Sequence, residues 1–284
     1  MLLMISDGRL GNQLFQLNAL EAARRNNEIA VLTGFREALP QLHRKRTFRL
    51  ARFGLSDKNL RILESLGEFL VKIRLIGAVT TSPGATSFSR KHGFLPVFVF
   101  TERYFQGWEF INNANRIPEV LQQLFATGEV LTPRHQLIDN TTSPVFVHVR
   151  RGDYLDFPKG TSSSLPVEWY LGLMEEMRVT LDDPHFYVVS DEPDFCRHAF
   201  PPRSDISVVD SGSAVADMAL MAHCKAGILS ASSFSWWAAR AASNSSGGPF
   251  YAPRGWLNWH GKAPGSSVPA ADFLVFKHVE LSTF

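Results

Sequence analysis

The sequence predicts an α/β protein in which two doubly wound halves face a cleft. Its opening residues read as a strand, a glycine turn, a helix and a second strand, which is the β-α-β unit of a parallel sheet. After Pro144, strands and helices alternate again and more regularly. The polar segment between Pro133 and Pro144 is typical of a linker. We therefore expect an N-terminal domain at residues 1–135, a linker at 136–143 and a C-terminal domain at 144–284.

Apolar spacing and turn residues predict the elements of the N-terminal domain. Gly8 and Gly11 separate the first strand from a helix, and the apolar residues between Leu60 and Ile76 recur at helical spacing. Pro118 stands where a helix tolerates proline, in the first turn. The resulting assignment is strands at residues 2–5, 29–32 and 97–100, helices at 13–26, 60–76 and 117–125, and a loop at 80–92.

In the C-terminal domain, short runs rich in β-branched and aromatic residues predict buried strands, and longer periodic runs predict helices. Trp236 and Trp237 fall in the last of these helices, where neighbouring side chains point about 100° apart, so at least one belongs in the core. The predicted strands are residues 145–149, 186–189, 206–209 and 226–229, and the helices are 168–181, 214–223 and 234–242.

Composition excludes several classes of protein. Lys and Arg number 29 and Asp and Glu 27, a net charge of +2, which gives no electrostatic footprint for nucleic acid. No apolar run is long enough to span a membrane, and the N-terminus turns polar too early for a signal peptide, so a cytoplasmic protein is expected. Cys196 and Cys224 lack metal-ligand spacing and are expected to be buried apolar residues.

Polar clusters follow three of the predicted strands, at residues 148–154 (HVRRGDY), 190–191 (SD) and 230–233 (SASS). Ligands of open parallel sheets bind outside the carboxyl ends of the strands. Taken singly, arginines beside an aspartate can form a surface ion pair, and serines before a helix are often N-caps. Together, an arginine fork and a helix start with serine hydroxyls favour a phosphate or diphosphate.

Other phosphate-binding and hydrolytic classes lack their motifs. The sequence contains no G-x-x-x-x-G-K-[ST] loop and no G-x-S-x-G elbow, and Gly8 and Gly11 do not complete G-x-G-x-x-G. It also contains no D-x-D pair of the kind that bridges a nucleotide sugar through a metal. We therefore expect arginine and a helix N-terminus to meet the diphosphate charge without a metal.

Three segments resemble the signatures of α-1,2-fucosyltransferases of glycosyltransferase family 11, namely residues 8–16 (GRLGNQLFQ), 148–154 (HVRRGDY) and 232–237 (SSFSWW). Further resemblances lie at 104–106, 217–224 and 252–256, so the match runs in order along nearly the whole chain. It implies a GT-B-like fold of two Rossmann-like halves, the first binding the acceptor and the second GDP-fucose. The implied reaction is inverting, metal-independent transfer of L-fucose from GDP-β-L-fucose to the 2-hydroxyl of a terminal galactose, with no cofactor.

The resemblance also implies roles for individual residues. Arg150 would hold the β-phosphate of GDP, Ser232 and Ser233 the diphosphate, and His148 and Asp217 the guanine or its surroundings. Gly11 and Asn12 would close on the donor from the other half. The candidate catalytic residues are Arg150, Asp153 and Asp156, and the candidate substrate-binding residues are His148, Arg151, Tyr154, Asp191, Asp217, Ser232, Ser233, Gly11 and Asn12.

Some alternatives remain open. Asp153 is either a partner of an arginine or a base, Asp156 is a second candidate base, and the leaving phosphate could itself accept the proton. Another linkage, a related deoxyhexose donor, or a glycan-binding protein without activity would fit the same motifs. The expected partners are GDP-fucose and a galactose-terminated or lipid-linked glycan. The basic residues between His43 and Arg52 either form a solvated face or contact an anionic substrate or the inner face of the cytoplasmic membrane.

Overall fold

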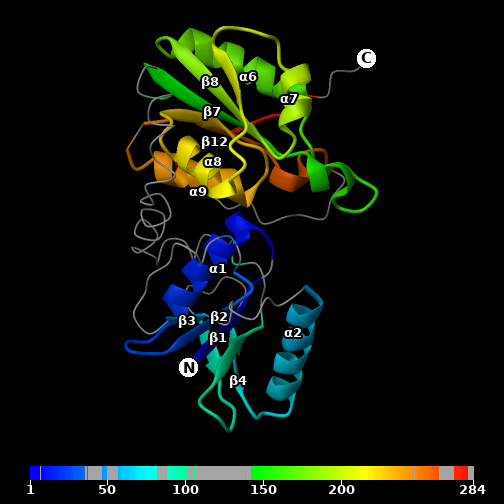
Figure 1. Ribbon diagram of the computed structural model, residues 1–284, viewed down its shortest axis with the longest axis vertical. Coiled ribbons are helices and arrows are strands. Elements are labelled where there is room, and N and C mark those ends of the chain that lie inside the picture. Colours follow the sequence, from blue (N-terminus) through cyan, green and yellow to red (C-terminus); the bar gives the residue numbers. More distant parts are fainter. Residues whose placement is uncertain are drawn as a thin grey trace. The chain divides into compact units, whose positions relative to one another are not determined.

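The chain divides into two compact units, Met1–Leu124 and Phe125–Phe284, and each is built on one six-stranded sheet (Figure 1). The structure is a computed structural model that describes residues 1–6, 8–35, 37, 47–49, 57–81, 88–101, 105, 138, 142–245, 247–261 and 272–280. The helix predicted at 117–125, five of the eight residues of the linker predicted at 136–143 (all but 138, 142 and 143), and basic residues 43–46 and 52 lie outside these described residues.

The first unit is a mainly parallel sheet with the strand order β3-β2-β1-β6-β4-β5. Helix α1 connects the neighbouring strands β1 and β2, and the chain moves on from β2 to β3 at the edge of the sheet. The connection through α2 then runs from β3 back across the sheet to β4, in the opposite direction. Right-handed crossovers then place the two helices on opposite faces of the sheet. The elements are β1 (Leu2–Ile5), α1 (Leu10–Ala23), β2 (Ala30–Thr33), β3 (Thr47–Arg49), α2 (Asp57–Lys72), β4 (Gly77–Thr80), β5 (Ser89–Lys91) and β6 (Phe98–Phe100).

The loop predicted at 80–92 is wrong in part, because β5 lies within it and pairs antiparallel with β4. This strand stands at the edge of the sheet and has the sequence Ser-Arg-Lys, with two of its three side chains exposed. A short polar edge strand carries no apolar alternation, so the pattern that identifies the inner strands is absent from it.

The second unit is a wholly parallel sheet with the strand order β12-β11-β10-β7-β8-β9. All the strands and helices predicted for residues 145–242 are present, with ends shifted by at most two residues. The elements are β7 (Ser143–Val149), η3 (Gly152–Asp156), α6 (Val167–Thr180), β8 (Pro184–Ser190), α7 (Pro193–Ala199), β9 (Ile206–Val209), α8 (Ala214–Ala222), β10 (Ala226–Ile228), α9 (Ser233–Ala242), β11 (Phe250–Pro253), η4 (Trp256–Asn258) and β12 (Leu274–Lys277).

The core of the second unit is organised around β7, all seven residues of which are buried. Trp236 and Trp237 are both buried, with ring centroids 4.9 Å apart in an edge-to-face arrangement, which confirms their predicted place in the core. Cys196 and Cys224 are free and buried, also as predicted. None of the helices in the described ranges combines the length and apolar character that crossing a bilayer requires.

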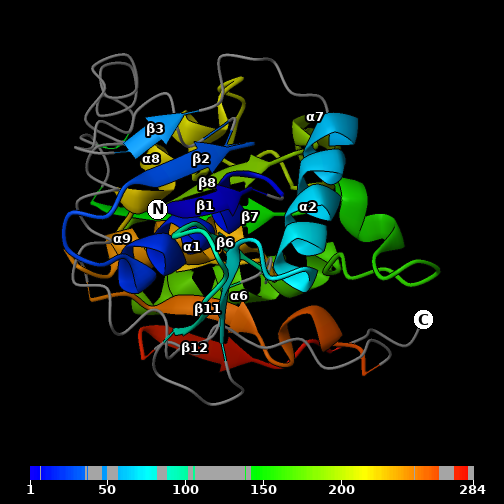
Figure 2. The same cartoon turned by 90° about the horizontal axis from the view of Figure 1, so that it is seen from below.

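The strand order of the second sheet reverses direction at β7. From β7 the chain proceeds outward through β8 and β9, and it then returns to the other side of β7 to lay down β10, β11 and β12 (Figures 1 and 2). Open parallel sheets bind ligands outside the carboxyl ends of the strands at such a reversal. The ends of β7 and β10 are joined there by the Ser230 N–H, which donates to the His148 carbonyl over 3.1 Å. The topology therefore predicts that a ligand binds near residues 148–154 and 230–234.

Close packing between β7 and β10 requires glycine at position 227. A Cβ atom there would lie 2.3 Å from two carbons of the Phe146 ring. We expect Gly227→Ala to lower the free energy of unfolding by about 1–3 kcal/mol, the usual cost of overpacking a core. Gly172→Ala is the matched control: Gly172 lies exposed in α6 with nothing within 4 Å of its Cβ position. Removing that glycine should raise stability by about 0.5–1 kcal/mol. Urea denaturation followed by tryptophan fluorescence measures both, and parent-like stability of Gly227→Ala would contradict the packing argument.

Candidate functional site

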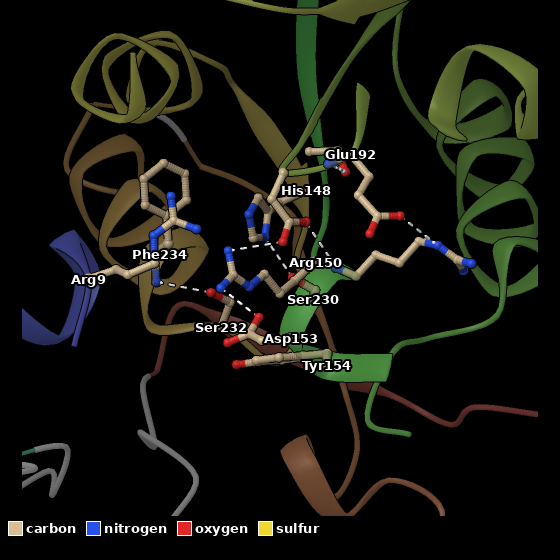
Figure 3. A network of polar contacts seen from close by, with 12 residues as sticks. Arg9, His148, Arg150, Asp153, Tyr154, Glu192, Ser230, Ser232 and Phe234 are labelled. Atoms are coloured by element: carbon tan, nitrogen blue, oxygen red, sulfur yellow. Dashed lines mark hydrogen bonds and ion pairs between the residues drawn. The ribbon is translucent and has the colours of Figure 1, made fainter. Parts of the chain in front are cut away.

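The ends of β7, β8 and β10 bring polar side chains from three separate parts of the sequence together (Figure 3). His148 is the penultimate residue of β7, and Arg150 and Arg151 follow that strand directly. Asp191 follows β8, and Ser230 and Ser232 follow β10. The three sequence clusters predicted to meet at one edge of the sheet are thus adjacent in the structure.

Arg150 is held by two carboxylates. Its guanidinium lies 2.6 Å from an Asp153 oxygen and 3.2 Å from an Asp191 oxygen, and it also stands 5.6 Å from the centre of the Tyr154 ring. The side chains of Arg150 and Asp191 are 15% and 16% exposed, whereas that of Asp153 is 63% exposed. The inner contact, with Asp191, is therefore sheltered from water, and the outer one, with Asp153, is open to exchange with a ligand.

Asp191 also positions the second arginine. Its other carboxylate oxygen accepts the backbone N–H of Arg151 over 3.0 Å. The Arg151 side chain itself turns away from Asp191. It donates from Nε to Glu192 over 2.9 Å, and its guanidinium carbon lies 3.8 Å from the centre of the Phe195 ring. One carboxylate thus fixes the backbone after β7 and the direction of the Arg150 side chain at once.

Gly152 makes room for that carboxylate. A Cβ atom at position 152 would lie 2.6 Å from an Asp191 oxygen, closer than real Cβ contacts. Any larger residue would push Asp191 away from Arg150 or move the backbone of η3. The glycine in the HVRRGDY string is thus required by the ion pair rather than by an unusual backbone angle.

His148 precedes the two arginines in the chain and is 4% exposed. Its Nδ1 is 2.6 Å from the Ser230 hydroxyl, and its ring centroid is 5.3 Å from that of Phe234. Burial, and to a smaller extent the Arg150 charge, lowers the pKa of this imidazole to about 3. The ring is therefore neutral at physiological pH and adds no positive charge to the site.

Helix α9 begins at the same place. Ser232 is its N-cap, and the Ser232 hydroxyl accepts the Phe234 N–H over 3.3 Å. The Ser235 hydroxyl lies 3.2 Å from the Ser230 carbonyl and 3.1 Å from that of Ser232, which fixes the turn between β10 and the helix. A helix N-terminus carries a partial positive charge, so it supports an anion bound above it.

Tyr154 joins the two sides of the site. Its hydroxyl donates to the carbonyl of Ala231 over 2.9 Å. Burial raises the pKa of this phenol to about 12, so the hydroxyl stays protonated and the bond persists across the physiological range. The segment after β7 is in this way fastened to the segment after β10.

The remaining candidate residues make other contacts or belong to other elements. The Asp156 carboxylate accepts the Gly160 N–H over 2.6 Å and so closes a turn beyond η3. Asp217 lies in the first turn of α8, where it accepts a hydrogen bond from the Ser211 hydroxyl. Ser233 is the first residue of α9. Gly11 and Asn12 belong to α1 in the first unit.

Sequence reasoning assigned no individual role to three contributors to the site, two of which lie within the predicted clusters. Glu192 holds Arg151, Ser230 holds His148, and Gly152 accommodates Asp191. Glu192 follows Asp191 directly and Ser230 begins the SASS cluster, so position alone would have indicated both. Nothing in the sequence shows that Gly152 faces a carboxylate, because that contact is made across two strands.

The arrangement is suited to binding an oxyanion of high charge. Arg150 offers planar N–H donors at the edge of the sheet, and the α9 N-terminus adds a dipole directed at the same region. In the part of the chain that the structure describes, no three His, Cys, Asp or Glu side chains are placed to hold a metal ion.

Comparisons with known proteins identify relatives of the chain. The family described as glycosyl transferase family 11 matches residues 100–247. The alpha-1,2-colitosyltransferase of Escherichia coli is 29% identical over 129 residues, which cover 43% of this chain and 44% of that protein. The galactoside 2-alpha-L-fucosyltransferase Sec1 of Mus musculus is 27% identical over 255 residues, which cover 82% of this chain and 62% of that protein. The matched region thus spans less than two thirds of either relative.

Solved structures support the fold. The crystal structure of POFUT1 in complex with GDP aligns with a TM-score of 0.52 at 13% identity, over 88% of this chain and 97% of that one. Together with the two α/β units, one on a mainly parallel and one on a wholly parallel sheet, this similarity confirms the predicted GT-B-like class of two Rossmann-like halves.

The burial of His148 predicts an imidazole that does not titrate in the neutral range. We expect its ring nitrogens to keep the chemical shifts of a neutral imidazole between about pH 5 and 8, whereas free histidine changes charge near pH 6.5. Nitrogen-15 NMR of labelled protein measures this, with His148→Gln to assign the signal. Since the pKa is lower in the folded than in the unfolded chain, the stability that His148 contributes is present above about pH 6.5 and declines as the pH falls towards 3. A charged ring at neutral pH would contradict the geometry.

Proposed function

Because the chain belongs to glycosyl transferase family 11, we propose that it is a galactoside α-1,2-fucosyltransferase. It transfers L-fucose from GDP-β-L-fucose to the 2-hydroxyl of a terminal galactose in an oligosaccharide or a lipid-linked glycan. The observation that carries the proposal is the Arg150 cluster at the reversal of strand order, which lies within the segment that the family matches. The relatives named as α-1,2-transferases of fucose and colitose support the linkage.

The diphosphate of GDP-fucose binds at Arg150 in this proposal. An exposed ion pair contributes only about 0–1 kcal/mol, so the outer pair of Arg150 with Asp153 gives way to a ligand of higher charge. The inner pair with Asp191 persists and keeps the guanidinium directed at the phosphates. The Ser232 end of α9 and its dipole complete the anion site.

The transfer is a single displacement with inversion at the fucose anomeric carbon. The galactose oxygen forms the new bond to that carbon as the bond to the β-phosphate oxygen breaks, and GDP leaves with the bonding electrons. Negative charge grows on the diphosphate in the transition state, where preorganised donors such as Arg150 stabilise it most. No metal and no cofactor take part in the proposed reaction.

The galactose hydroxyl must lose its proton to a base. Asp153 is the first candidate, because displacement from Arg150 would free its exposed carboxylate. The departing phosphate is the second. Asp156 is the third candidate, although its carboxylate already closes the turn to Gly160. A base has to reach the hydroxyl at hydrogen-bond distance, which distinguishes these groups once an acceptor is bound.

A related deoxyhexose donor is the second candidate function. The Escherichia coli relative is named for transfer of colitose, and it matches this chain at an identity close to that of the fucosyltransferase relative. The diphosphate site would serve either donor, since it contacts the part of the nucleotide sugar that both share. Residues that contact the sugar would decide between them.

We expect the full chain to add one deoxyhexose to a β-galactoside when it is supplied with GDP-fucose, and the product to form equally well with EDTA present. Mass spectrometry detects the transfer, and NMR of the product determines the linkage. GDP-colitose in a parallel reaction tests the second donor. A chain that binds GDP-fucose without transferring to any galactoside would be a binding protein, and one that binds no GDP would refute the proposal altogether.

Arg150→Ala should lower kcat by about 100- to 1,000-fold, the usual effect of losing one preorganised donor to a developing oxyanion. Arg203→Ala is the matched control, because Arg203 is also an arginine of the second unit paired with carboxylates, Glu175 and Asp205, but lies on the surface outside the cluster. The control should keep the parent rate. Steady-state assays compare the two, and turnover of Arg150→Ala close to that of the parent would remove Arg150 from the mechanism.

A further inference from the structure

Helix α2 carries large apolar side chains on its outer surface. Ile62, Leu66, Phe69 and Ile73 are 56%, 48%, 56% and 52% exposed. Their spacing of four, three and four residues places them in one row along the helix, because residues three and four apart share a face. The row includes Ile73 just past the last helical residue, since its N–H still donates to the Phe69 carbonyl. We call these four side chains the α2 stripe.

The α2 stripe is not the face that packs the helix onto its own sheet. Leu60 is buried, and a Cβ at the buried Gly67 would lie 3.7 Å from a methyl group of Val99 in β6. These two positions lie on the side of the helix away from the stripe. The helix thus has its own core contacts, and the stripe adds a second apolar surface that lies exposed, outside the core formed by the described residues of the first unit. Contiguous exposed apolar surface of this kind usually marks an interaction site.

Two further apolar side chains lie near the end of the stripe. Phe94 is 86% exposed and Leu95 is 40% exposed. Their backbone N–H groups donate to the carbonyls of Arg74 and Leu75 over 2.8 Å each, which holds this turn against the residues that follow α2. Figures 1 and 2 show α2 along one side of the sheet of the first unit.

One flank of the stripe is basic. Lys58 lies one turn before Ile62, Lys72 lies one turn after Phe69, and Arg61 lies on the same side, and all three are exposed. An open hollow of about 500 Å³ adjoins this flank and is lined, among the described residues, by Lys58, Arg61, Ile62 and Ser65. Glu68 lies farther around the helix, beyond Arg61, and Glu64 lies on the opposite side from the stripe. Cations therefore border the apolar row, with a hydroxyl beside them.

We propose that the α2 stripe docks on the surface of a bilayer that contains anionic lipid. The apolar side chains enter the boundary between headgroups and acyl chains, and Lys58, Arg61 and Lys72 pair with lipid phosphates. An amphipathic helix with bulky apolar residues on one face and basic residues beside them has the chemistry of an interfacial helix. This interaction is separate from the transfer reaction, so failure of either proposal leaves the other standing.

The test is flotation of the full chain with vesicles of phosphatidylcholine alone and with about a quarter of phosphatidylglycerol. We expect binding to the anionic vesicles that weakens at high salt. Leu66→Ser/Phe69→Ser should lower the partition coefficient by roughly tenfold or more, because it removes two large apolar side chains from the interface. Lys58→Gln/Arg61→Gln should lower it roughly fivefold for each charge removed. Val179→Ser and Arg203→Gln, exposed residues of the second unit, are the matched controls and should bind like the parent.

Several results would overturn the proposal. One is a parent chain that stays in solution with both kinds of vesicle, and another is retained binding by both α2 variants. Sedimentation velocity tests the main competitor: a dimer that Leu66→Ser/Phe69→Ser dissociates, without vesicle binding by the parent, would assign the stripe to a second copy of the chain. Circular dichroism establishes that each variant is folded, and the charge variant tests the surface independently if the apolar variant does not fold.

Discussion

The Asp191 carboxylate organises the candidate site because one of its oxygens fixes the backbone after β7 and the other fixes the Arg150 side chain. One accepts the Arg151 backbone N–H and so sets the path of the chain after β7, while the other pairs with the Arg150 guanidinium. A sheltered charge of this kind is strongly favoured only while both partners remain, since an unpaired charge in a partly buried place is costly. Binding of an anion at Arg150 therefore depends on a residue that need not touch the anion.

Carboxylates pair with both arginines of the site, so the site carries no surplus of positive charge. Arg150 and Arg151 face Asp153, Asp191 and Glu192, and His148 is neutral. Affinity for a diphosphate then comes from the fixed direction of the Arg150 guanidinium and from the dipole of α9. The diphosphate would take the place of the exposed Asp153 carboxylate. Such a site holds its arginines in place when empty, so little side-chain entropy is lost when the ligand binds.

The sequence alone was sufficient to predict most helices and strands of the second unit and fewer of those in the first. Fully buried parallel strands such as β7 are unbroken apolar runs, so residues 145–149 were identified from composition, and parallel topology then brought His148, Asp191 and Ser232 to one edge. The edge strand β5 is polar and has no local signal, whereas β12 carries a short apolar run, Leu-Val-Phe, that would have identified it. Contacts made across strands, such as Gly152 against Asp191, depend on register and could not be predicted from one sequence. The roles of the site residues towards a donor and an acceptor stay predictions.

The contact between Gly152 and Asp191 makes the effects of substitution at these two positions interdependent. A side chain at 152 would displace the Asp191 carboxylate or the backbone of η3, and shortening residue 191 to make space removes the charge that positions Arg150. Each single change is harmful by a different route, and the double change repairs only the steric one. The two positions are therefore expected to be epistatic, because the effect of a side chain at 152 depends on which residue stands at 191.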